Sequence, residues 1–100
     1  MTILFLKMKI EVTSVFTNKL KRQIEYISLD KKTAARKFNQ LVFRKIKEIS
    51  NNPKINRKSI FFEDENIRDL IVKGYLIVYE ISPAENRIVV FGFYKWEKDL

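Results

Sequence analysis

Residues 67–81 read Ile-Arg-Asp-Leu-Ile-Val-Lys-Gly-Tyr-Leu-Ile-Val-Tyr-Glu-Ile, and this stretch decides the fold. Two apolar runs, Ile67–Val72 and Tyr75–Ile81, are separated by only two residues, which is the spacing of a tight β-hairpin. Gly74 is suited to this turn because glycine adopts positive φ without steric cost. The second run is almost continuously apolar, as is typical of a strand covered on both faces. The stretch therefore predicts two antiparallel strands at the centre of a sheet.

Further strands are expected on both sides of this hairpin. On the C-terminal side, Ser82–Asn86 has the composition of a turn, and Arg87–Tyr94 reads as the last strand. On the N-terminal side, Ser59–Phe62 predicts a short strand, and Glu63–Asn66 predicts a polar turn. The C-terminal half of the chain is therefore expected to form three or four strands in sequence.

The N-terminal part begins with a predicted strand over residues 3–13. From Met8 onward apolar and polar residues alternate with the period of two that a half-buried strand requires. Met8 is also a possible start of the chain, with residues 1–7 as an upstream extension. The apolar run near the N-terminus is too short for a signal peptide or a membrane span, so the protein is expected to be soluble and cytoplasmic, with no membrane partner.

Two helices are expected next. Phe16, Leu20, Ile24 and Ile27 form one apolar stripe of a first helix, for which Ser14 or Thr17 is the expected cap. A second helix is predicted from about Lys31 to Asn51, with Asp30 as its N-cap and Pro53 ending it. Its expected buried stripe has helical spacing and consists of Ala35, Phe38, Val42, Ile46 and Ile49.

This order predicts an α+β fold. An N-terminal strand, an antiparallel two-helix hairpin and a small, mainly antiparallel sheet follow one another, with the hairpin packed on one face of the sheet. The 100 residues are expected to form a single domain spanning 1–100. The other sheet face is expected to be open, with lysines and arginines gathered around exposed tyrosines.

The composition restricts the chemistry. The sequence holds no cysteine and no histidine, which removes disulfides, thiol nucleophiles, and metal sites and catalytic sets built on these residues. We expect no metal and no cofactor. Any catalysis would use carboxylates, Lys, Arg or Tyr. The formal net charge of +8 favours anionic partners, such as nucleic acid or an acidic protein.

The hairpin of residues 67–81 resembles the "R-x-L-x-V-x-x-Y-x-I-x-Y" hairpin of the RelE/ParE superfamily of type II toxins. The helix ending Ile49-Ser50-Asn51-Asn52-Pro53 is similar to the family's "I-x-x-L-x-x-N-P", and Ile88–Phe91 matches its last strand. The resemblance covers about residues 8–96. It implies a toxin of a toxin–antitoxin module, with roles in growth inhibition and plasmid stabilisation.

The resemblance also implies partners. A cognate antitoxin is expected to bring an acidic, partly amphipathic segment that lies across the basic sheet face or docks against the helices and folds as it binds. The antitoxin is also expected to carry the complex to operator DNA. The target is either the ribosome and its mRNA, cut by a metal-independent endoribonuclease, or DNA gyrase. A third possibility is a non-enzymatic basic binding module or a degenerate toxin, acting mainly in an antitoxin complex.

Seven residues are candidates for the site. Those that would act in catalysis are Arg68, Tyr75, Lys73 and Lys95, and those that would bind RNA are Tyr79, Tyr94 and Lys98. Cations neutralise phosphate, and tyrosine rings stack on bases. For Tyr75 and Tyr79 the alternative is packing within the sheet, and for Arg68 it is a framework ion pair. Leu76 stands where RNA-cleaving members often carry arginine, and the tail lacks their frequent arginine, so the target stays open.

Overall fold

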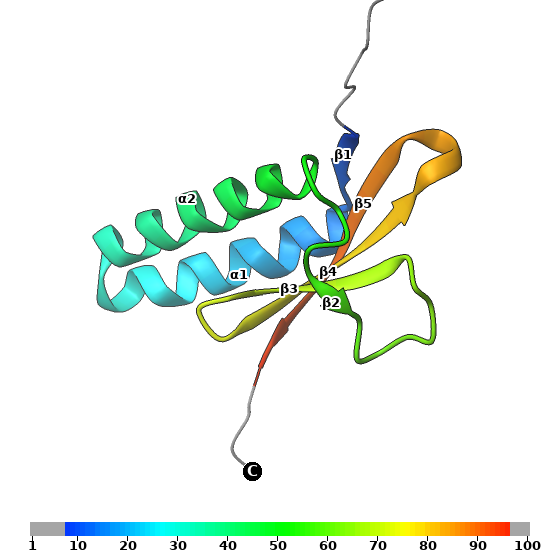
Figure 1. The fold of residues 1–100 in the computed structure, drawn as a ribbon. Helices are drawn as coiled ribbons and strands as arrows, with labels where there is room; N and C mark the ends of the chain where they lie inside the picture. Colours follow the sequence, from blue (N-terminus) through cyan, green and yellow to red (C-terminus); the bar gives the residue numbers. More distant parts are fainter. Residues whose placement is uncertain (1–7, 97–100) are drawn as a thin grey trace, which may run out of the picture.

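The computed structural model describes residues 8–96 (Figure 1). Its elements are, in order, β1 (Lys9–Val12), α1 (Ser14–Asp30), α2 (Lys32–Ile49), β2 (Arg57–Lys58), β3 (Ile67–Val72), β4 (Tyr75–Ser82), the 3₁₀ turn η1 (Pro83–Glu85) and β5 (Arg87–Lys95). This order confirms the predicted α+β fold. The part of the predicted first strand that precedes Met8 lies outside the described residues.

The sheet has the strand order β1-β5-β4-β3-β2. β1 pairs with β5 in parallel, and every other pair is antiparallel. The predicted hairpin joins β3 to β4, with positive φ at Gly74 (83°) and also at Lys73 (49°). A bulge shifts the β4–β5 register, so that Val78 pairs with Gly92 whereas Tyr79 pairs with Val90.

The helices form the predicted hairpin, but three capping assignments were wrong. The cap of α1 is Thr13, whose Oγ1 accepts a hydrogen bond from the Phe16 amide at 3.1 Å, whereas Ser14 and Thr17 lie inside the helix. Asp30 is the last residue of α1 and does not cap α2. One extended residue, Lys31, joins the helices and donates its amide to the Ile27 carbonyl, so α1 runs three residues beyond its predicted stripe.

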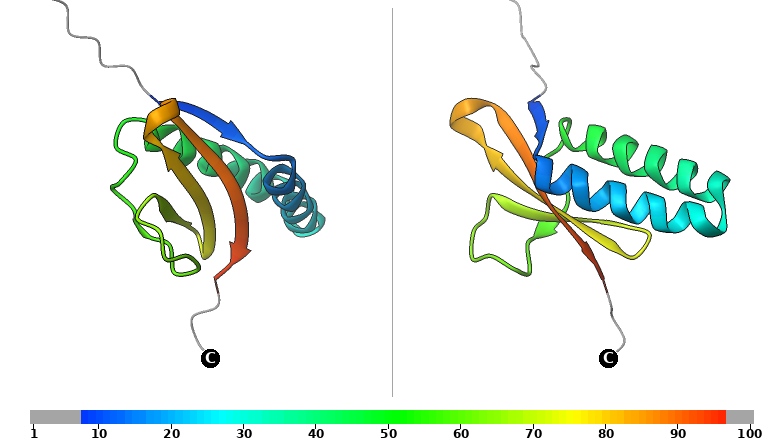
Figure 2. Two further views of the ribbon diagram at one scale, coloured as in Figure 1. Left: turned by 90° about the vertical axis from the view of Figure 1, so that its right-hand side faces the viewer. Right: turned by 180° about the vertical axis from the view of Figure 1, so that it is seen from behind.

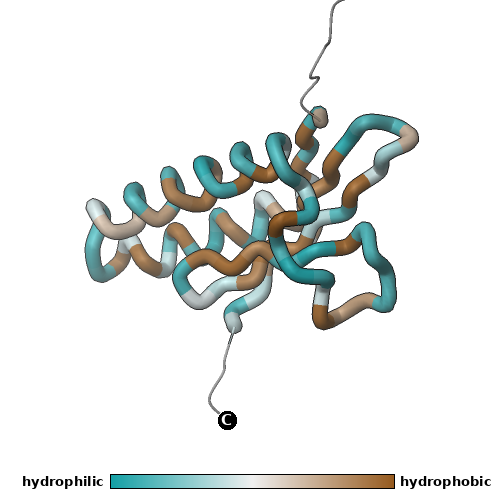
Figure 3. Tube along the Cα trace, in the orientation of Figure 1, coloured by the Kyte–Doolittle hydropathy of each residue, from teal (hydrophilic) through white to brown (hydrophobic). Residues whose placement is uncertain are grey.

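The helical hairpin covers one face of the sheet (Figure 2), and the apolar stripes of both helices point into the core between the two layers. Apolar and polar residues alternate along both helices at the predicted spacing (Figure 3). Phe16 of α1 packs edge-on against Phe93 of β5, with ring centroids 5.9 Å apart. Burial of this interface is the main source of stability in a chain this small.

The second face of the sheet is not open, which corrects the prediction made for it. Residues 59–62 are not a strand. Phe61 packs on Tyr94, with ring centroids 5.0 Å apart, and Phe62 packs on Phe91 at 5.8 Å. Leu76 and Val78, which alternate with the core residues of β4, are fully buried on this face. We call residues 59–66 the aromatic loop.

Buried Asp69 holds the start of the aromatic loop. One oxygen of its carboxylate accepts the Ile60 amide at 2.9 Å and lies 3.6 Å from the guanidinium of Arg57. The Ser59 amide donates to the Ile67 carbonyl at 2.7 Å. These bonds turn the chain after β2, and for this reason the Ile-Phe-Phe run does not continue as a strand.

Candidate functional site

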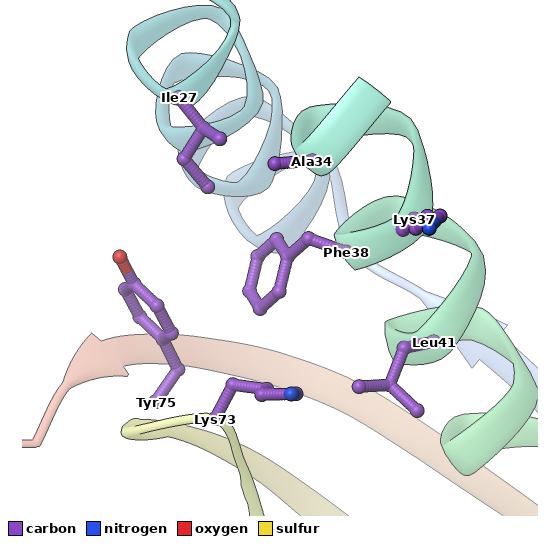
Figure 4. A pocket seen from close by; sticks show the side chains of 7 residues that line it. All are labelled: Ile27, Ala34, Lys37, Phe38, Leu41, Lys73 and Tyr75. Carbon is purple, nitrogen blue, oxygen red and sulfur yellow. The ribbon is translucent and has the colours of Figure 1, made fainter. Parts of the chain in front are cut away.

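A groove of about 510 Å³ lies between the helical hairpin and the β3–β4 turn (Figure 4). We call it the helix–hairpin groove. It is lined by Ile27, Ala34, Lys37, Phe38, Leu41, Lys73 and Tyr75. α1 and α2 project beyond the sheet at this end, and the turn between β3 and β4 lies opposite them (Figure 1). The groove therefore opens where the two layers of the fold diverge.

The groove has an apolar floor and two cations. Phe38 and Tyr75 pack together in its wall, with ring centroids 5.1 Å apart. Lys37 projects from α2 and Lys73 from the turn. Lys73 adopts left-handed backbone geometry, which is unfavourable for a residue with a side chain and places a cation at the tip of the hairpin. Such a site is suited to an apolar side chain flanked by carboxylates.

Tyr75 separates this groove from a second hollow of about 350 Å³. Its ring stacks on Phe93 at 5.1 Å, and Tyr75 pairs in register with Lys95. We call this the β5-side hollow, and its walls are more polar. It is lined by Lys19, Arg22, Gln23, Tyr26, Tyr75, Phe93 and Lys95. The structure thus brings three of the four catalytic candidates, Lys73, Tyr75 and Lys95, to one end of the sheet.

Arg68 does not join them. It pairs with Tyr79 in the middle of the sheet, and its side chain is only 12% exposed. Its Nε donates to the Glu65 carbonyl at 2.7 Å, and its Nη1 donates to the Asn56 carbonyl at 3.1 Å. The guanidinium therefore ties the aromatic loop to the segment that follows α2.

Tyr79 lies in the core and not on a surface that RNA can reach. Its side chain is fully buried, its hydroxyl donates to the Pro53 carbonyl, and the Asn56 amide donates to it at 3.1 Å. Burial raises the pKa of the Tyr79 phenol above its ordinary value of 10.0, because the charged phenolate is poorly solvated there. The packing alternative holds for this residue.

Tyr94 is exposed and lies at the edge of the sheet. The Lys19 ammonium lies 4.4 Å from the centroid of its ring, and Phe61 packs against it. Lys98, the remaining binding candidate, lies outside the described residues. The second face thus presents aromatic rings from the loop and β5, and the predicted cluster of cations around tyrosines lies in the β5-side hollow and not on this face.

The cations lie on the helices instead. Residues 14–49 contain ten lysines and arginines and three carboxylates, which gives this segment a net charge of +7 out of +8 for the chain. The remaining residues contain ten cations and nine carboxylates, a net charge of +1. The charge that the sequence assigns to the protein as a whole belongs almost entirely to one layer.

Three residues that shape these surfaces were missed at the level of sequence. Lys37 lines the groove, Asp69 anchors the aromatic loop, and Phe61 covers the second sheet face. Only Asp69 carried a signal, since an acidic residue inside a strand of apolar residues is unusual unless it is paired.

In residues 8–96 no group of three or more acidic side chains is arranged to hold a metal ion. No helix in this range has the length and hydropathy needed to cross a bilayer.

Comparison with known proteins gives a consistent result. The model of a family described as ParE toxin of the type II toxin–antitoxin system parDE matches residues 10–99. No curated protein matches the chain. The fold is similar to the chromosomal ParDE TA system from P. aeruginosa, with a TM-score of 0.73 and 15% identity over 91% of this chain and 98% of that one. It is also similar to the isolated E. coli RelE toxin, with a TM-score of 0.64 and 14% identity over 92% and 87% of the two chains.

Proposed function

The chain belongs to the ParE toxin family of type II toxin–antitoxin systems, and from this premise we propose that a cognate antitoxin silences it by filling the helix–hairpin groove. The observation that carries the proposal is the groove itself, an apolar floor bordered by Lys37 and Lys73. Both lysines lack an ion-pair partner among residues 8–96, so carboxylates of a partner would find two unpaired cations.

The expected antitoxin segment is amphipathic. Its apolar side chains would cover Ile27 and Leu41, which are half-buried in the groove, and its Asp or Glu residues would approach the two lysines. Apolar burial would supply most of the affinity, and the charges would set orientation and association rate. Such segments are often disordered until they bind.

The experiment uses the full chain and its cognate antitoxin, which is sought as a small acidic protein encoded by the adjacent gene. Isothermal titration should show that Lys37→Glu/Lys73→Glu weakens binding roughly 30-fold or more, since two attractive contacts become repulsive. The control is Lys54→Glu/Lys58→Glu, which changes the net charge equally at two exposed residues outside the groove. Equal loss in both variants would show that net charge alone, and not the groove, holds the antitoxin.

For the target, we propose DNA gyrase, bound as a protein and not cut as RNA. Two of the candidate groups are committed to the framework and not to RNA, since Arg68 bonds backbone carbonyls and Tyr79 lies in the core. The catalytic candidates that are left, Lys73, Tyr75 and Lys95, include no arginine. The exposed rings of the aromatic loop add an apolar surface, which is more typical of protein contact than of phosphate contact. The site of action would be the cytoplasm.

One observation favours the second candidate, mRNA cleavage on the ribosome. Lys19, Arg22 and Lys95 line the β5-side hollow together with Tyr75. Expression without the antitoxin separates the two, because gyrase poisoning gives gyrase-linked DNA breaks with intact mRNA, whereas a nuclease gives cuts in translated mRNA. Tyr75→Phe should leave gyrase-linked toxicity unchanged. The nuclease would be supported if the wild-type chain cuts mRNA and a folded Tyr75→Phe protein has lost its toxicity. A harmless folded chain would indicate a binding module or degenerate toxin.

A further inference from the structure

The outward side of α2 carries a row of cations that the groove does not use. Lys32, Arg36 and Lys47 are exposed and are separated by 4 and 11 residues. These spacings correspond to about one and three turns of helix, so the three side chains project from the same side. We call Lys32, Arg36 and Lys47 the outward row.

The outward row is separate from the helix–hairpin groove. The α2 residues that line the groove are Ala34, Lys37, Phe38 and Leu41, and none of them belongs to the row. The buried stripe from Ala35 to Ile49 faces the sheet between these two flanks of the helix. A partner seated in the groove therefore leaves the outward row accessible.

The cations of the outward row are not held in ion pairs by the part of the chain that the structure describes. None of the three forms an ion pair within residues 8–96. Of the three carboxylates in the helical layer, Glu48 is paired with Lys45 on the other flank of α2, at 3.9 Å, whereas Glu25 and Asp30 of α1 are too few to balance its ten cations. Exposed cations repel one another unless an external anion neutralises them, so the helical layer retains an unneutralised positive field.

We propose that the outward row binds the phosphate backbone of a duplex nucleic acid. The row extends over 16 residues of α2, about 22 Å from the first to the last, and this length of duplex DNA carries roughly 13 phosphate charges. Thr33 and Gln40, also exposed on this side, add neutral hydrogen-bond groups of the kind that contact phosphate. A single strand would need a platform of aromatic rings, and on this side of α2 Phe43 is the one exposed ring among the described residues.

The test is a binding titration of the full chain with a labelled 20-base-pair DNA duplex between 50 and 200 mM salt. Each phosphate contact contributes about 0.9 to the slope of log K against log salt. Lys32→Gln/Arg36→Gln/Lys47→Gln should therefore reduce the slope by about 2.7 and weaken binding at 100 mM at least tenfold. The matched control is Lys9→Gln/Lys54→Gln/Lys58→Gln, which removes three exposed cations outside the helices and should change the slope by less than one.

Three further arms complete the experiment. The titration is repeated with a 20-base-pair RNA duplex. The duplex that binds with the higher affinity, DNA or RNA, is identified as the source of the phosphates. Poly-glutamate tests an acidic protein as the alternative, and tighter binding of this polymer than of either duplex would overturn the proposal. It is also overturned if the wild-type chain binds no duplex at 50 mM salt, or if both triple variants lose equal slope. Urea denaturation of both variants confirms that they fold. The target assays above are independent of these results.

Discussion

Removing the hydroxyl of Tyr79 tests whether this residue is a framework group or part of a binding surface. The hydroxyl is buried and makes two hydrogen bonds, to the carbonyl of Pro53 and from the side chain of Asn56. Tyr79→Phe keeps the ring in place and leaves both partners without their bond. A buried polar group left unsatisfied costs about 1–3 kcal/mol, so we expect a loss of about 2 kcal/mol in the free energy of unfolding.

Urea denaturation at pH 7 measures this loss. For a slope of about 1–2 kcal/mol per molar urea, the midpoint should fall by roughly 1–2 M with an unchanged slope. Tyr94→Phe is the matched control, because its hydroxyl is on an exposed side chain and its ring contacts are retained. We expect the control to change stability by less than about 0.5 kcal/mol.

The pH dependence gives a second test of the same hydroxyl. The pKa of Tyr79 is raised in the folded state, so its contribution to stability is fully present below the unfolded value of about 10 and is lost as pH rises through the folded pKa. The stability difference between wild type and Tyr79→Phe should therefore shrink above pH 10, by up to about 1.4 kcal/mol per pH unit. A midpoint equal to that of wild type at pH 7 would refute the hydrogen-bonding argument, and lost toxicity with unchanged stability would make Tyr79 a binding residue.

Three further substitutions test other parts of the fold. Asp69→Ala should lower the free energy of unfolding by about 1–3 kcal/mol and speed chymotrypsin cleavage in the aromatic loop, because the Ile60 amide loses its acceptor; an unchanged cleavage rate would contradict this anchoring role. Gly92→Ala should lower the melting temperature, at a cost of about 1–3 kcal/mol, because a Cβ there would lie 2.9 Å from the Cβ of Val78; a calorimetric scan identical to wild type would refute the close approach. Lys73→Asn should raise the free energy of unfolding by roughly 0.5–1 kcal/mol, because asparagine tolerates the left-handed turn, and should weaken antitoxin binding, because a groove cation is lost. Urea denaturation measures the first effect and titration calorimetry the second. If neither changes, both roles of Lys73 are contradicted.

Periodicity predicted the helices and strands of this fold because burial of one side of each element both stabilises it and requires apolar residues at regular spacing. The stripe through Phe16 and Leu20 appears in the structure as the buried side of α1, and the two-residue spacing at Lys73-Gly74 appears as a hairpin turn. These signals are local, since they depend on residues a few positions apart. The resemblance of the hairpin to one toxin superfamily rested on the same local features.

The surfaces were harder to predict because they depend on contacts between distant segments. The Ile60-Phe61-Phe62 run has high β propensity, but the Asp69 carboxylate, nine residues after Ile60, takes the amide and turns the chain. The predicted basic sheet face failed for a different reason. The prediction used the net charge of the whole chain, +8, whereas the distribution along the sequence places +7 of it in residues 14–49, which form the helices.

Polar side chains of the hairpin that resembles the toxin family form hydrogen bonds to backbone groups of the framework. Arg68 bonds two carbonyls, Tyr79 bonds a third, and buried Asp69 bonds an amide, and all of these partners lie between the end of α2 and the start of β3. That segment contains only a two-residue strand, so side chains must satisfy backbone groups that a longer strand would pair. Arg68 and Tyr79, two polar residues of the motif, therefore belong to the framework, whereas Tyr75 lines the groove. The surfaces of α2 that are left for partners are its two flanks, with the helix–hairpin groove on one side and the outward row on the other.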